Sequence, residues 1–179
     1  MRLDIGSGII AGLIGGVFFG IMMQMMNAPT PQGGEMLMMT MVAKVVRSES
    51  TLVGWLYHLF NSALIGAIFS WLFGRRLQSF AAGLGWGAAY GFVWWILGAL
   101  ILMPIFLGLL PLAPLIVEPM RPVAVGSLLG HLIYGIILGG SLIMMKPRVL
   151  GGPLQDEPRE TGRTDSLRRL SKEPKGNNR

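Results

Sequence analysis

The sequence predicts an all-α polytopic membrane protein with four transmembrane helices, which we expect to form two repeated helical hairpins. Hydrophobic residues make up 52% of the chain and charged residues only 13%, and similar glycine and histidine patterns occur in both halves. A bilayer core about 30 Å thick is crossed by roughly 20 apolar residues in a helix. Four windows reach that length without a Lys, Arg, Asp or Glu: residues 5–26, 52–73, 80–103 and 123–145.

Basic residues predict the orientation of these helices, because Lys and Arg concentrate in the short loops on the cytoplasmic side. We expect both termini to be cytoplasmic, with the first window uncleaved because it is longer than the apolar part of a signal peptide. The net charge of +6 is explained by this topology and by contact with the lipid bilayer, so we predict no nucleic-acid partner. The inner side carries Arg2, Arg75, Arg76, Lys146 and Arg148, and the outer side carries Lys44, Arg47 and Arg121.

Two outer loops and a tail complete the predicted organisation. Loop 27–51 opens with the turn-forming letters NAPTPQGG, and loop 104–122 contains five prolines, which favours a broken or re-entrant segment. Residues 1–147 form the predicted membrane domain, and residues 148–179 form a basic cytoplasmic tail with too little apolar content to fold. The rest of the first loop predicts an amphipathic helix at the membrane surface, with an apolar stripe of Met36, Met39, Val42 and Val46.

An internal repeat is indicated by glycines that recur every fourth residue in the first and third windows. Each of these windows is followed, one helix later, by a histidine: 38 residues separate Gly20 from His58, and 40 separate Gly91 from His131. Glycine stripes let helix backbones approach closely in a bilayer, so we expect the first and third helices at the centre of the bundle. They pack there on each other or on their hairpin partners. Two parallel hairpins would be related by a pseudo-two-fold axis along the membrane normal.

His58 and His131 are the only histidines, and both lie inside apolar windows at nearly the same predicted depth. Asn61 and Tyr134 follow them at helical spacing and are the candidate polar neighbours. Three interpretations stay open. The imidazoles could form hydrogen bonds between helices, hold a haem b or a metal ion as paired ligands, or carry protons.

The methionines suggest a second candidate site on the outer side. Thioethers bind Cu(I), although methionine also fills gaps between helices. The chain has no cysteine, which excludes disulfides and thiolate metal sites. The candidate copper ligands are Met22, Met25, Met26, Met36 and Met39.

Motifs for catalysis do not occur in the sequence, since it lacks a G-x-S-x-G elbow, an H-E-x-x-H helix and a P-loop. We therefore expect a small non-catalytic integral membrane protein that serves as an accessory or structural subunit of a larger complex, with other membrane proteins or itself as partner. The first alternative is a haem b or metal-binding electron-transfer module, and the second is a small transporter or channel.

The chain resembles an uncharacterised group of small bacterial four-helix integral membrane proteins. The resemblance is carried by GWLYH in the second window and by HLIYGIILGG in the last, and it covers roughly residues 5–145. It implies a location in the bacterial plasma (inner) membrane and no particular activity.

Overall fold

The structure is a computed structural model that describes residues 5–30 and 33–145. The described chain is mostly helical, and four of its helical runs are long and apolar enough to cross a membrane, as the sequence predicts. The predicted tail 148–179 lies outside the described residues. The elements are α1 (Ile5–Gln24), β1 (Asn27–Pro29), β2 (Glu35–Leu37), α2 (Met38–Val45), α3 (Thr51–Phe73), α4 (Phe80–Trp94), the π-helix η1 (Trp95–Leu102), α5 (Met103–Phe106), α6 (Ala113–Ile116), the 3-10 helix η2 (Glu118–Met120) and α7 (Arg121–Met145).

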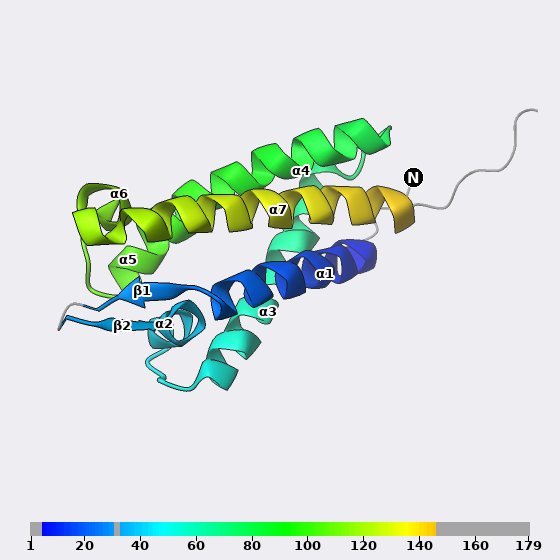
Figure 1. Ribbon diagram of the computed structural model, residues 1–179. Helices are drawn as coiled ribbons and strands as arrows, with labels where there is room; N and C mark the ends of the chain where they lie inside the picture. Colours follow the sequence, from blue (N-terminus) through cyan, green and yellow to red (C-terminus); the bar gives the residue numbers. More distant parts are fainter. Residues whose placement is uncertain (1–4, 31–32, 146–179) are drawn as a thin grey trace, which may run out of the picture. The chain divides into compact units, whose positions relative to one another are not determined.

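The four long helices pack in the order α3, α1, α7, α4. Direct helix contacts join α1 to α3, α1 to α7 and α4 to α7, and Figure 1 shows α7 between α1 and α4. The central helices are therefore the first and the fourth, and the prediction that the third lies at the centre is wrong. Burial agrees, since α7 buries ten of its 25 residues and α1 eight of its 20, against four of 15 in α4.

Glycines make the contact within each hairpin. A methyl group on Gly12 would overlap the Ser62 carbonyl oxygen of α3, and one on Gly87 would overlap the Gly135 carbonyl oxygen of α7. Both pairs of backbones therefore touch at positions that only glycine permits. This is how helices associate in lipid, where apolar side chains gain little by leaving the bilayer.

The two glycine contacts follow the same order along each hairpin. Gly8 meets Gly66 in the first hairpin, and Gly83 meets Gly139 in the second. Continuing by turns of the helix, this alignment pairs Gly16 with Gly91. Gly20 differs from these positions, because a Cβ atom there would meet the Trp55 ring rather than a backbone carbonyl.

The third long helix extends past its predicted end at residue 103 to Phe106. Pro104 falls in the first turn of α5 and has no N–H to donate back to the preceding helix. The Leu100 carbonyl oxygen instead accepts a hydrogen bond from the Leu112 N–H at 2.7 Å. The proline-rich segment is thus broken, as expected, but it contains three short helices, α5, α6 and η2, and is bonded to η1.

The short elements α2, β1, β2, α5 and α6 gather at one end of the long helices, which we call the capped end (Figure 1). The strands form an antiparallel pair in which Asn27 faces Leu37, and this pair was not predicted. Because β2 takes the residues up to Leu37, the amphipathic helix begins only at Met38. Met39 and Val42 of the predicted stripe are buried, whereas Met36 belongs to the strand and Val46 follows the helix and is exposed.

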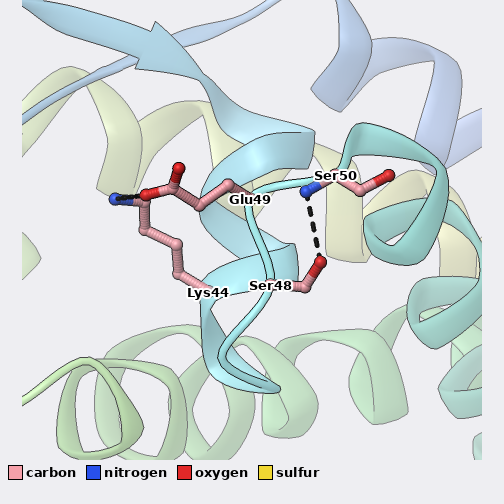
Figure 2. A network of polar contacts seen from close by, with 4 residues as sticks. All are labelled: Lys44, Ser48, Glu49 and Ser50. Atoms are coloured by element: carbon pink, nitrogen blue, oxygen red, sulfur yellow. Dashed lines mark hydrogen bonds and ion pairs between the residues drawn. The ribbon is translucent and has the colours of Figure 1, made fainter.

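A tight loop connects α2 to α3 at the capped end. Lys44 pairs with Glu49 at 3.5 Å, and the Ser50 N–H donates to the Ser48 hydroxyl at 3.2 Å (Figure 2). Arg47 adopts a left-handed conformation with φ of 61°, which turns the chain sharply after the helix. The loop therefore brings α2 back against the start of α3.

Candidate intramembrane cavity

A cavity of about 220 Å³ separates α3 from η1 in the half of the bundle nearest the capped end. Nearer the opposite end, α3 meets α4, the helix that η1 continues: the Phe69 ring lies 5.0 Å from the Tyr90 ring between centroids, and the Tyr90 hydroxyl donates to the Ile65 carbonyl oxygen at 3.0 Å. Toward the capped end, no hydrogen bond or ring contact joins the described residues of α3 and η1. The cavity fills the space between them, with α1 and α7 behind it and α2 and α5 beside it.

The cavity walls are mainly apolar and reach the outer surface of the bundle. Methionines and aromatic rings supply most of the lining. Leu64 and Phe106 line the cavity and are also about half exposed, at 49% and 50%. In a bilayer this surface faces lipid tails, so the cavity is accessible from the hydrocarbon region.

His58 is buried, with 9% of its surface exposed, and its ring joins two helices. The Nε2 atom lies 2.8 Å from the Gly16 carbonyl oxygen of α1. Since a carbonyl oxygen only accepts, Nε2 carries the hydrogen. The interpretation of a hydrogen bond between helices therefore describes His58 in this structure.

His131 lies in the same cavity but is bonded differently. Its Nδ1 atom is 2.7 Å from the carbonyl oxygen of Ser127, which is one turn earlier in the same helix. Nδ1 therefore carries the hydrogen of this ring. This bond does not connect α7 to any other helix.

Asn61 and Tyr134, the predicted polar neighbours, also line the cavity. The Tyr134 hydroxyl donates to the Ser62 carbonyl oxygen at 2.7 Å and so joins α7 to α3. Asn61 is half-buried, and among the bonds of the described residues none involves its amide. The structure thus brings all four predicted residues to one cavity, although with different roles.

Phe19 of α1 contacts both histidine rings edge-on, with centroid distances of 5.5 Å to His58 and 4.8 Å to His131. A haem held by both imidazoles would need His58 Nε2 to leave the Gly16 carbonyl, and Phe19 would have to leave the space beside the two rings. The observed arrangement is therefore not preformed for a haem with two histidine ligands.

The five candidate copper ligands differ in burial and in the element that carries them. Met39 is fully buried beside Gly54 of α3, whereas Met25 is 82% exposed. Met22 is partly buried on α1, and Met36 lies in β2. Met26 packs over Gly126 of α7 and is the one member of the set that lines the cavity.

Sequence reasoning missed the far wall of the cavity, which is formed by Trp94 and by Gly98 of η1. A Cβ atom at Gly98 would lie 3.8 Å from His131 Nε2, an ordinary contact distance. The available signal was that Gly98 falls outside the every-fourth register of Gly83, Gly87 and Gly91. The π-helix itself has no simple sequence signature, although such segments are frequent at functional sites.

Comparisons with protein-family models, with curated proteins and with solved structures found no match to this chain.

Proposed function

We propose that the protein is a small non-catalytic integral membrane protein that binds a lipophilic molecule in the cavity between α3 and η1. One observation carries this proposal: a largely apolar cavity lies among four span-length helices and opens on the surface that would face lipid tails. Ligand sites in proteins are typically apolar cavities with a few placed polar groups, and the two imidazoles with Asn61 supply these here.

The proposed location is the plasma membrane, with several crossings and both termini in the cytoplasm. Support comes from the basic residues Arg75 and Arg76 between α3 and α4, together with Arg2 and Lys146 in the sequence next to the ends of α1 and α7. The chain has no cysteine, so labelling of a single introduced cysteine shows on which side of the membrane that residue lies. In intact cells, a membrane-impermeant maleimide should label Gly33→Cys and spare Ser79→Cys; the reverse pattern would contradict the proposed orientation.

We also propose that the two hairpins are copies of one unit. The support is the matching order of glycine contacts, in which Gly8, Gly12 and Gly16 correspond to Gly83, Gly87 and Gly91. An independent test is to reconstruct ancestral sequences from an alignment of related sequences. If the hairpins are copies, the sequence identity between the two halves should be higher in the reconstructed ancestors than in the present chain.

The ligand proposal is tested by asking what the protein carries from its native membrane. Protein purified in mild detergent is extracted with organic solvent, and the extract is compared by mass spectrometry with that of total membrane lipid. Ala99→Phe places a ring in the cavity, and Ala89→Phe is the matched control because Ala89 is exposed on α4. We expect one enriched lipophilic molecule, reduced several-fold by Ala99→Phe and unchanged by Ala89→Phe. Equal extracts from both variants, or no enrichment in the unmodified protein, would refute the proposal.

Three other functions stay predictions and have separate tests. An accessory role requires a stable complex with other membrane proteins or with a second copy, which purification under mild conditions would reveal. A haem b module requires a reduced-minus-oxidised absorption spectrum that is lost in His58→Ala and His131→Ala. Transport requires substrate flux in liposomes.

A further inference from the structure

The two histidines offer different atoms to the cavity. Each ring uses one N–H on a backbone carbonyl, His58 through Nε2 and His131 through Nδ1. In a neutral imidazole the other nitrogen is then a hydrogen-bond acceptor. No Asp or Glu of the described chain lines the cavity to pair with a charged ring.

The acceptor nitrogen of His131 lies beside the π-helix. His131 Nε2 is next to Gly98, which has no side chain to cover it, and both residues line the cavity. Within the described residues no hydrogen bond to Nε2 occurs, and Asn61 on the opposite wall is in the same situation. Polar atoms in apolar surroundings need a partner, so these two groups are suited to a molecule that brings its own hydroxyl.

The remaining walls of the cavity favour a molecule that also contains an aromatic ring. Phe19 and Trp94 present aromatic surfaces, and Met23 and Met103 present polarizable thioethers. Aromatic rings pack well against both kinds of side chain. An apolar tail would reach the surface of the bundle beside Leu64 and Phe106, which line the cavity and are about half exposed.

We propose that the cavity binds a lipid-soluble phenol or quinol, whose hydroxyl group donates a hydrogen bond to His131 Nε2. The Asn61 amide is the second polar contact of the hydroxylated ring. This inference rests on the proposed function, because it specifies the chemical class of the lipophilic molecule.

The test uses two probes that differ only in the hydroxyl hydrogen: 4-hexylphenol, and 4-hexylanisole, in which a methyl group replaces it. Binding to the full-length protein in lipid nanodiscs is followed by quenching of tryptophan fluorescence, with empty nanodiscs as the blank. The unmodified protein should prefer the phenol by roughly fivefold beyond the difference in partitioning, as expected for one hydrogen bond.

Variants at His131 separate the hydrogen bond from simple filling of the cavity. His131→Leu should remove the preference while leaving anisole binding intact, and His131→Gln, which keeps an acceptor, should retain most of it. Because partitioning into the bilayer is the same for all variants, the ratio between variants isolates the contribution of the side chain. Circular dichroism confirms that each variant is folded.

The outcomes distinguish this inference from the proposed function. If both probes bind and His131→Leu does not change their ratio, the hydroxyl contact is refuted while lipophilic binding stands. If neither probe competes with the molecule carried from the native membrane, the phenol or quinol class is refuted. If no variant or probe gives saturable binding and no native molecule is enriched, the proposed function fails as well.

Discussion

The two hairpins face each other along two interfaces. We call the tightly packed one the closed side and the one that contains the cavity the open side. On the closed side, between α1 and α7, each bulky residue faces a glycine: Tyr134 covers Gly15, and Phe19 covers Gly130. On the open side, between α3 and η1 with the end of α4, a cavity of about 220 Å³ keeps the helices apart. The same kind of helix therefore packs tightly or leaves a cavity depending on a few side chains.

Aligning the hairpins by their glycine contacts identifies these side chains. Tyr90 corresponds to Gly15, and Tyr57 corresponds to Gly130. On the open side, bulky residues thus stand where the closed side has glycine: Tyr57 and Trp94 both line the cavity, and Tyr90 packs on Phe69 of α3 at the end opposite the capped end. Because two large side chains cannot interdigitate as a ring and a glycine do, the backbones stay apart and the cavity remains.

The largest expected effect follows from filling the closed side. Gly130→Leu would overlap the Phe19 ring, and we expect a loss of about 3 kcal/mol in the free energy of unfolding, in the upper range for overpacking. Gly85→Leu is the matched control, since nothing lies within 4 Å of a Cβ atom there. Both are measured by denaturant titration in mixed micelles. Equal losses would show that the contact between α1 and α7 is not tight.

The histidines give the next largest difference. His58→Leu removes a hydrogen bond between α1 and α3, whereas His131→Leu removes only a bond within α7. We expect His58→Leu to lower the free energy of unfolding by about 1 kcal/mol and His131→Leu by a few tenths. The same titration compares them, and a larger loss for His131→Leu would contradict the assignment of roles.

The tyrosine hydroxyls test the links from α3 to the second hairpin. Tyr134→Phe and Tyr90→Phe each remove one bond, to the Ser62 and Ile65 carbonyl oxygens respectively. Each should cost about 0.6 kcal/mol, the average for such bonds between membrane helices. Tyr90→Phe should in addition loosen the open side, seen as faster amide exchange in η1. Identical exchange in both variants would argue against that coupling.

The smallest effect has the opposite sign. Gly98→Ala adds a methyl group toward the cavity at ordinary contact distance, 3.8 Å from His131 Nε2. Since glycine costs conformational entropy in a helix, we expect a gain of about 0.5 kcal/mol. Thermal unfolding of the two proteins side by side measures it. A clear loss of stability would mean that the π-helix depends on glycine at this position.

The four long apolar helices were predictable because each shows in the sequence as an uninterrupted apolar window of the length that crosses a bilayer, and charges mark the limits of these windows. The pairing of helices was predictable in part. A glycine stripe reveals which face packs, but α7 became central through Gly130 and Tyr134, whose partners on α1 lie more than a hundred residues away. Single-sequence periodicity does not report contacts of that range.

The candidate site was found through its two histidines, which are unusual inside apolar windows. Its far wall was not, since Trp94 looks like any other residue of a span and the one signal at Gly98, its place outside the every-fourth glycine register, does not indicate a cavity. The short strands were missed because three residues on each side of a turn carry almost no alternating pattern. The candidate copper ligands differ in burial because they belong to different elements: Met25 is exposed after α1, whereas Met39 is buried in α2.

The glycine contacts also determine the order in which the protein can be assembled during synthesis. Gly8 and Gly12 pair with a helix that ends at Phe73, so the first hairpin has both of its surfaces before the second half is translated. The second hairpin closes in the same way once α7 is made. The cavity is lined by α3 from one hairpin and by η1 and His131 from the other. It can therefore form only after both hairpins have been made and have packed together.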